Sequence, residues 1–182
     1  MTRHVLPHRP ELKPPSWAER DRLLAVRVYR AAERWSLRQL LAVVSVLGNG
    51  PLWYAAIAWL AIGPFEYQQC AVRMLLLGMV NLLLYYVLKR GTGRPRPYEH
   101  CVDIRACVPA LDRFSFPSGH TLHAVAYSVL LAWYFPSFAL PLALFTGLVM
   151  VSGIALGLHY PSDVLAALLI GLTTGGLMLT TA

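Results

Sequence analysis

The sequence predicts an all-α integral membrane protein, a helical bundle with about five transmembrane helices and an N-terminal amphipathic helix. Two observations support this fold class. Of the 182 residues, 57% are hydrophobic and 14% are charged, well below the roughly 25% charged residues of soluble domains. Residues 114–182 contain no Lys or Arg, and their only acid is Asp163. This part of the chain is therefore expected to face lipid or protein.

The first 38 residues are expected to form a basic lead and an amphipathic interfacial helix, outside a membrane-embedded domain of residues 39–182. They carry nine Lys or Arg residues against four acids. Prolines and repeated arginines leave no continuous apolar run, so we expect no signal peptide. From Trp17 to Arg38, apolar and basic residues alternate in a way that suits a helix on an anionic membrane surface. A helix packed on the polar face of the domain fits equally well.

Five apolar stretches approach the length of about 20 residues that crosses the hydrocarbon core. Asn49-Gly50-Pro51 interrupts the first stretch, and we expect a single kinked span there because each half alone is too short. Pro136 and Pro141 indicate a tight turn between the third and fourth spans. The expected spans are residues 39–64, 69–88, 118–136, 138–158 and 164–181.

Five crossings would place the N-terminal segment, the long loop 89–117 and the turn 159–163 on one side of the membrane. The basic N-terminal block predicts that this side is cytoplasmic. We expect an integral protein of a bacterial-type cell membrane. Neither basic block interleaves aromatic residues on a soluble module, so we expect no nucleic-acid partner.

Three polar clusters stand out from the apolar sequence: residues 89–97 (KRGTGRPRP), 117–120 (PSGH) and 159–163 (HYPSD). Charged and titratable groups in membrane segments are retained mainly where chemistry uses them. The predicted topology brings all three clusters to the same membrane face. We therefore interpret them as parts of one candidate site.

The first cluster offers cations for a phosphoryl group. Arg96, between two prolines, presents a planar fork that matches phosphate oxygens, and Lys89 presents a movable point charge. A positive-inside stop-transfer cluster is the alternative interpretation. The segment lacks the Gly-x4-Gly-Lys-Ser/Thr pattern of a P-loop.

The second cluster opens the third span. Free backbone amides at a helix start can bind an anion, Ser118 adds a hydroxyl donor, Gly119 permits close approach, and His120 exchanges protons near neutral pH. An ordinary Pro/Ser helix start is the alternative. His123, one turn later, is expected to pack or to support the site.

The third cluster places His159 four residues before Asp163. A carboxylate bonded to one imidazole nitrogen leaves the other nitrogen free as a nucleophile or base. Each residue also has an alternative interpretation: Asp163 is a favourable acid in the first turn of a helix, and His159 is a histidine at the membrane interface.

Together, Lys89 with Arg96-Pro97, then Pro117-Ser118-Gly119-His120, then Ser152 with His159 and Asp163 resemble the signature of the type 2 phosphatidic acid phosphatase and vanadium haloperoxidase superfamily. The resemblance covers roughly residues 39–182. It implies a helical bundle that needs no metal or cofactor. It further implies His159 as the nucleophile, Asp163 orienting it and His120 as the acid. Phosphate ligands would be Lys89, Arg96, Ser118 and the amide of Gly119.

This resemblance implies a membrane phosphatase that acts on a lipid phosphate or diphosphate through a phosphohistidine intermediate. A phosphatidate, a phosphatidylglycerol phosphate or a polyprenyl diphosphate would fit, with membrane lipids as partners and the oligomeric state open. Five apolar spans argue against a soluble haloperoxidase.

The chain departs from the family pattern at one position. The third motif of the family begins Ser-Arg, and that arginine binds phosphate, whereas Ser152 here precedes Gly153. A weakened member that binds phosphorylated lipid or a membrane partner is the alternative function. Arg90, Arg94 or Arg113 are candidate substitutes. Packing is the other interpretation of the glycine, because Gly153 and Gly157, like Gly171 and Gly175, form a Gly-x3-Gly pair.

The three cysteines do not define a disulfide framework. Cys70 lies in an apolar stretch and is expected to be a small buried hydrophobe. Cys101 and Cys107 share a polar loop, where we expect free thiols and leave a disulfide as the alternative. No His/Cys spacing suggests zinc.

Overall fold

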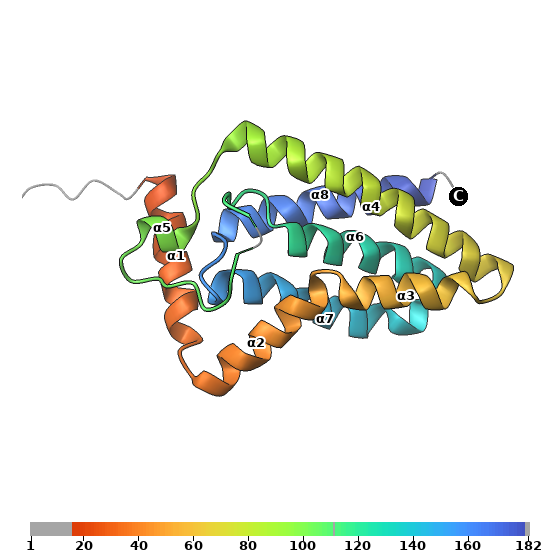
Figure 1. Cartoon of the computed structure of the whole chain (residues 1–182), viewed down its shortest axis with the longest axis horizontal. Helices are drawn as coiled ribbons and strands as arrows, with labels where there is room; N and C mark the ends of the chain where they lie inside the picture. Colours follow the sequence, from red (N-terminus) through yellow and green to blue (C-terminus); the bar gives the residue numbers. More distant parts are fainter. Residues whose placement is uncertain (1–15, 111, 181–182) are drawn as a thin grey trace, which may run out of the picture.

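The computed structural model describes residues 16–110 and 112–180, and the basic lead before residue 16 lies outside this part (Figure 1). The described residues form helices and connections without strands. The all-α fold class is confirmed. The elements in chain order are α1 (Trp17–Ala31), α2 (Trp35–Gly48), α3 (Pro51–Ala61), α4 (Phe65–Thr92), α5 (Pro97–His100), α6 (Gly119–Tyr134), the short 3₁₀ helix η1 (Pro136–Phe138), α7 (Ala139–Ala155) and α8 (Pro161–Thr180).

Among the described residues, three segments are long and apolar enough to cross a membrane, and they contain α4, α7 and α8. Helices α2 and α3 form a fourth if they count as one span, since they are bent by 42° at their junction. This bend confirms the kink predicted at Asn49-Gly50-Pro51. The third expected span, residues 118–136, corresponds to α6, whose 16 residues fall short of the about 20 that cross a bilayer.

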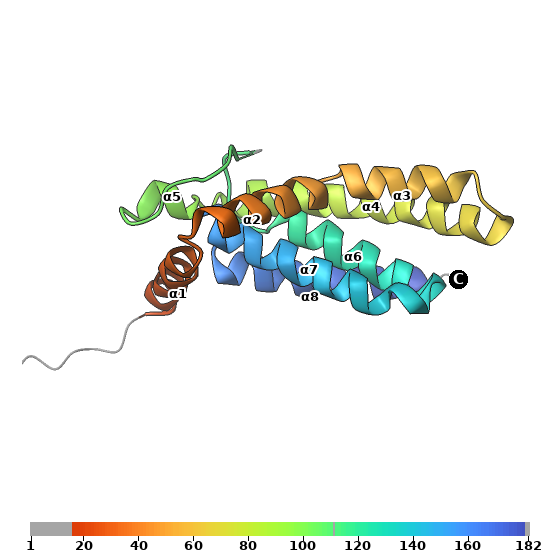
Figure 2. The ribbon, with the colours of Figure 1, turned by 90° about the horizontal axis from the view of Figure 1, so that it is seen from below.

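Helix α6 lies inside the bundle and packs against α4, α7 and α8 (Figures 1 and 2). Glycines of α8 allow this close approach. A Cβ atom added at Gly171 would lie 2.9 Å from the carbonyl oxygen of Leu122, and one at Gly175 would lie 3.1 Å from that of Ala126. The predicted packing role of Gly171 and Gly175 is confirmed. Gly157 instead has a φ of 78° and follows the end of α7, so the Gly153/Gly157 pair is no helix-packing face.

Large apolar side chains cover the outer surface of the helices that surround α6. Leu83 and Trp59, for example, are 66% and 60% exposed. The core between the helices holds other apolar side chains, among them Trp53, Met74 and Leu130. An apolar outside around an apolar core is the arrangement expected of a bundle that faces lipid.

Helix α1 ends at Ala31, so the predicted continuous helix from Trp17 to Arg38 is wrong. The break has a tertiary cause, because α1 lies across the ends of α7 and α8 whereas α2 runs along α7 (Figure 2). Asp21, Ala25 and Tyr29 form its buried stripe. This contact agrees with the interpretation of a helix packed on the polar face of the domain.

The three polar clusters gather at one end of the bundle (Figure 1). Helix α4 ends there at Thr92, where Gly93 adopts the left-handed conformation with a φ of 56°. Helices α6 and α8 begin at this end and α7 finishes there. The expected juxtaposition of the clusters is therefore observed.

All three cysteines are free. Cys70 is buried in α4, Cys101 is buried in the loop after α5, and Cys107 is exposed.

Candidate active site

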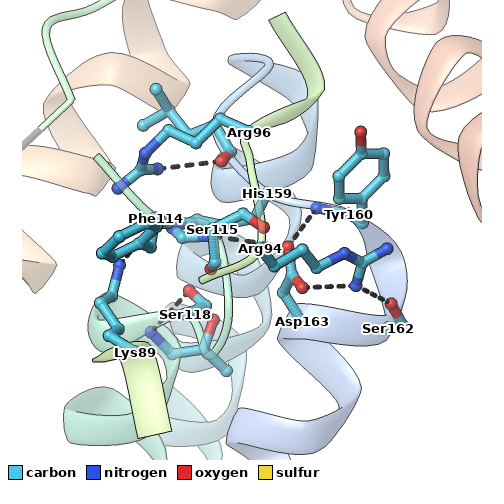
Figure 3. A network of polar contacts seen from close by, with 12 residues as sticks. Lys89, Arg94, Arg96, Phe114, Ser115, Ser118, His159, Tyr160, Ser162 and Asp163 are labelled. Carbon is cyan, nitrogen blue, oxygen red and sulfur yellow. Dashed lines mark hydrogen bonds and ion pairs between the residues drawn. The ribbon is translucent and has the colours of Figure 1, made fainter. Parts of the chain in front are cut away.

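His159 lies in the connection between α7 and α8 with only 2% of its surface exposed. The amides of Leu158 and His159 donate hydrogen bonds to the carbonyl oxygen of Gly153, over 3.1 and 3.0 Å, which fixes the backbone at the end of α7. The imidazole Nδ1 lies 2.7 Å from the carbonyl oxygen of Ser115 (Figure 3). Because a carbonyl oxygen only accepts, Nδ1 carries the proton and the Nε2 lone pair is free.

The surroundings of His159 also favour its neutral form. Burial lowers the pKa of His159, and the charges of Arg96 and Lys89 lower it further, whereas the carboxylate of Asp163 raises it. The net effect is a pKa below the ordinary value. At neutral pH the imidazole is therefore unprotonated at Nε2, the form that a nucleophile requires.

Asp163 is completely buried in the first turn of α8. One carboxylate oxygen accepts a hydrogen bond from the Tyr160 amide over 2.8 Å, and the other accepts one from Arg94 Nη1 over 2.7 Å. Its distance to His159 Nδ1 is 3.8 Å, too long for a hydrogen bond. The direct bond expected from the sequence is absent because Ser115 takes its place, but the carboxylate stays close enough to stabilise positive charge on the imidazole.

Arg94 links this carboxylate to the N-terminal helix. Its second terminal nitrogen pairs with Asp21 of α1 over 2.6 Å. Asp21 also accepts a hydrogen bond from the Ser162 amide over 3.0 Å. The guanidinium carbon stands 4.2 Å from the centre of the Tyr160 ring. Helix α1 is thereby connected, through one arginine, to the acid beside His159.

Lys89 and Arg96 lie close together, and both are almost fully buried. They meet at the carboxylate of Asp112, which lies 2.6 Å from Lys89 Nζ and 3.0 Å from Arg96 Nη2. Arg96 Nη1 also donates to the carbonyl oxygen of Leu158 over 2.9 Å. The first cluster is thus joined to the segment that carries the third.

Ser118 is the N-cap of α6, as its position before Gly119 predicts. Its hydroxyl accepts a hydrogen bond from the Thr121 amide over 3.4 Å and donates one to the Thr121 hydroxyl over 3.0 Å. The following amides, of Gly119 and His120, have no acceptor within the helix because they belong to its first turn. The amide of Ser118 donates to the carbonyl oxygen of Asp163 over 3.4 Å, which joins the second cluster to the third.

Gly153 faces this site from the last turn of α7. A Cβ atom at this position would lie 3.4 Å from His159 Cδ2 and 3.9 Å from Ser118 Oγ, both ordinary contacts. A side chain added here would therefore start between these two residues. Of the three arginines considered as substitutes, Arg90 and Arg113 are exposed, and Arg94 is paired with two carboxylates.

A cavity of about 440 Å³ begins at the polar end of the site and continues between apolar side chains, within the size range of small-molecule sites. His120, Gly119 and Asp112 line it, together with His123, whose ring nitrogen lies 3.0 Å from the Gly119 carbonyl oxygen. Its remaining walls come from the junction of α2 with α3 and from α4 and α6: Gly48, Asn49, Gly50, Trp53, Tyr54, Ile57, Leu75, Gly78, Met79, Leu82, Tyr85, Tyr86 and Tyr127.

Four residues of the site are not among those that the sequence predicts: Asp21, Arg94, Asp112 and Ser115. The sequence suggests Arg94 only as a substitute for an arginine at position 153. Asp112 carried one usable signal, because it is an acid in a loop rich in cations. Asp21 and the Ser115 carbonyl carried none, since their contacts join segments that are distant in the sequence.

Comparison with known proteins agrees with the geometry. The sequence profile of the PAP2 superfamily matches residues 71–182. Undecaprenyl-diphosphatase BcrC of Bacillus subtilis (strain 168) is 33% identical over 129 residues, which are 67% of this chain and 66% of that protein. The chain thus matches about two thirds of the length of this relative.

Two solved structures share the fold. The first transmembrane PAP2 type phosphatidylglycerolphosphate phosphatase from Bacillus subtilis has a TM-score of 0.76 at 25% identity, covering 90% of this chain and 85% of that chain. Aquifex aeolicus LpxE has a TM-score of 0.78 at 26% identity, covering 87% and 94%. With its helical membrane fold and its assembled polar clusters, the chain belongs to the PAP2 superfamily.

Proposed function

We propose that this protein removes a phosphoryl group from a phosphorylated membrane lipid through a phosphohistidine intermediate. The observation that carries the proposal is the state of His159. Its Nδ1 proton is held by Ser115, its Nε2 is free to attack, and two buried cations lie beside it. This combination provides a nucleophile next to a site for negative charge.

In the first step, Nε2 of His159 attacks phosphorus in line and the bond from phosphorus to the leaving oxygen breaks. The negative charge of the bound phosphoryl group stabilises the imidazolium form of His120, which lines the cavity, and this imidazolium donates its proton to that oxygen. In the second step water attacks the phosphohistidine while His120 accepts a water proton, and the bond between nitrogen and phosphorus breaks. Inorganic phosphate leaves and both histidines return to their starting states.

Positive charge builds up on His159 when its nitrogen bonds to phosphorus. Asp163, 3.8 Å from Nδ1, compensates this charge in a buried environment where electrostatic interactions are strong. Lys89, Arg96, Ser118 and the amide of Gly119 are the proposed ligands of the phosphoryl oxygens. No step of this sequence requires a metal ion.

The apolar cavity is the proposed site for the first part of the lipid tail. It starts at His120 and is walled by aromatic and aliphatic side chains, which suit an acyl or prenyl chain. The sequence similarity to an undecaprenyl-diphosphatase favours a polyprenyl diphosphate among the three substrate types. The cytoplasmic placement of this end of the bundle stays a prediction from the distribution of basic residues.

Purified protein in detergent would be assayed for phosphate release from a polyprenyl diphosphate, a phosphatidylglycerol phosphate and a phosphatidate. We expect the highest kcat/KM for the polyprenyl diphosphate, and much slower release from a water-soluble phosphomonoester because it leaves the cavity empty. Chelator in every reaction tests whether metal is needed. Equal rates for lipid and soluble esters would contradict the proposed use of the cavity.

The absence of an arginine at position 153 favours a second candidate, a weakened member that binds phosphorylated lipid. Replacing Gly153 by arginine separates the two functions. The space beside Gly153 admits the start of the side chain, and a new charged hydrogen bond to the phosphoryl group is worth about 1.5–3 kcal/mol. We expect kcat/KM to rise by roughly tenfold to 100-fold.

Gly153→Gln is the matched control for the arginine variant, because it adds a side chain with a hydrogen-bond donor but no charge. Turnover in the parent, with a gain of roughly tenfold to 100-fold in Gly153→Arg, supports the phosphatase. An inactive parent that only the arginine variant converts into an enzyme would support the binding protein.

A further inference from the structure

The carboxylate of Asp112 lies in the cation site proposed for the substrate. Its Oδ1 accepts hydrogen bonds from Lys89 Nζ over 2.6 Å, from Arg96 Nη2 over 3.0 Å and from the Phe114 amide over 3.0 Å. Its Oδ2 accepts one from the hydroxyl of Tyr85. Two cations, an amide and a hydroxyl thus converge on one carboxylate.

These donors are of the kind that bind phosphoryl oxygens. The Oδ1 atom of Asp112 accepts hydrogen bonds from three such donors at once. This environment is closer to that of a bound phosphoryl oxygen than to that of a carboxylate oxygen in a surface ion pair. Burial raises the pKa of the Asp112 carboxyl, but the hydrogen bonds from Lys89 and Tyr85 and the charges of Lys89 and Arg96 outweigh it and hold the pKa below its ordinary value. The group is therefore an anion at neutral pH.

The loop around Asp112 is held by contacts that do not involve this carboxylate. The backbone oxygen of Asp112 accepts a hydrogen bond from Arg96 Nε over 2.9 Å, and the Ser115 amide donates one to the Arg94 carbonyl oxygen over 2.8 Å. The side chain itself is 28% exposed and lines the cavity beside Gly119 and His120. It has room to turn away while the backbone stays in place.

From this geometry we infer that Asp112 is an internal competitor of the substrate: its carboxylate occupies the anion site of Lys89 and Arg96, and an incoming phosphoryl group must displace it. The inference rests on the proposed function in one respect, the use of Lys89 and Arg96 as phosphate ligands. It adds a residue that sets how tightly any anion binds there.

The affinity for a phosphoryl group depends on the fraction of molecules in which the Asp112 carboxylate has left the cation site. When only a fraction of molecules has the carboxylate turned away, the apparent Kd equals the intrinsic Kd divided by that fraction. An open fraction of about 10% weakens binding tenfold. The same competition favours release of inorganic phosphate after hydrolysis, because Asp112 returns to the vacated cations.

Asp112→Asn tests this inference directly. The amide oxygen keeps the shape and an acceptor but loses the negative charge, so inorganic phosphate should bind about tenfold more tightly. Binding is measured by isothermal titration calorimetry on the purified full chain in detergent. Asp103→Asn is the matched control, since Asp103 belongs to the same loop but forms an exposed ion pair with Arg30. We expect the parent affinity in this control.

Tyr85→Phe provides a second variant if Asp112→Asn does not fold. It removes one donor from the carboxylate without a change of charge, and we expect phosphate to bind roughly two- to fivefold more tightly. A further Lys89→Met substitution in the Asp112→Asn protein should abolish the tighter binding. Phosphate affinity that stays unchanged or falls in folded Asp112→Asn and Tyr85→Phe, or that survives Lys89→Met, would overturn the inference.

The titration does not depend on turnover, so the two proposals can fail separately. Tighter phosphate binding by Asp112→Asn in a protein that hydrolyses no lipid supports the internal competitor and contradicts the phosphatase. Robust lipid hydrolysis by the parent, with unchanged phosphate affinity in Asp112→Asn, supports the phosphatase and contradicts the competitor.

Discussion

His159→Ala is expected to reduce phosphate release by at least about 10⁴-fold, because it removes the proposed nucleophile and the proposed covalent intermediate then cannot form. The parent and the variant would be compared by kcat on the same lipid substrate in detergent. A neighbouring base cannot replace the lost group, since attack on phosphorus requires the nitrogen to lie in line with the leaving oxygen.

The same experiment includes two controls for folding. His100→Ala removes an exposed histidine at the end of α5 and should keep the parent activity. His159→Asn keeps a side-chain donor that can reach the Ser115 carbonyl oxygen, and it should be folded but inactive. Full activity in folded His159→Ala would contradict the assignment of the nucleophile.

The proposed phosphohistidine intermediate can be tested by a second measurement. Rapid quenching of the parent with a labelled substrate should trap phosphoprotein that is stable in base and labile in acid, as expected for phosphohistidine. His159→Ala should show none. Labelled protein in His159→Ala would place the covalent bond on another residue.

The helices could be predicted because long apolar stretches and their breaks are local properties of the sequence. Asn49-Gly50-Pro51 predicted the bend between α2 and α3, and Pro136 predicted the turn at η1. The break after Ala31 has no comparable local signal. It arises because α1 packs across the ends of α7 and α8, a contact that depends on the assembled bundle.

In the candidate site, too, individual residues could be predicted from the sequence but their tertiary contacts could not. Lys89, Arg96, Ser118, His120, His159 and Asp163 could be selected because polar groups are costly in apolar sequence. The residues that these six contact could not be predicted from the sequence. Asp21 reaches Arg94 across 73 positions of the chain, and the acceptor that holds the His159 proton is a backbone oxygen 44 positions away. Backbone acceptors carry no residue signature, and charge pairing across a fold follows from geometry.

Asp163→Asn is expected to lower kcat by up to about 10⁴-fold, the loss seen in serine proteases when the acid beside the catalytic histidine is replaced by its amide. The amide can still accept a hydrogen bond from Tyr160, but it no longer compensates the charge on His159 during phosphoryl transfer. Affinity for inorganic phosphate should change little, because Asp163 does not contact Lys89 or Arg96. Steady-state kinetics and the phosphate titration separate these two effects.

Asp21→Asn is the control that isolates this charge from the ion pair with Arg94. It removes the other carboxylate that Arg94 contacts and leaves Asp163 intact. If the charge beside His159 matters, the loss of kcat in Asp21→Asn should stay below about tenfold, the size of a repositioning effect. An equal loss in both variants would show that Asp163 acts by holding Arg94 and the end of α1, and its proposed role as the counter-charge of His159 would then be wrong.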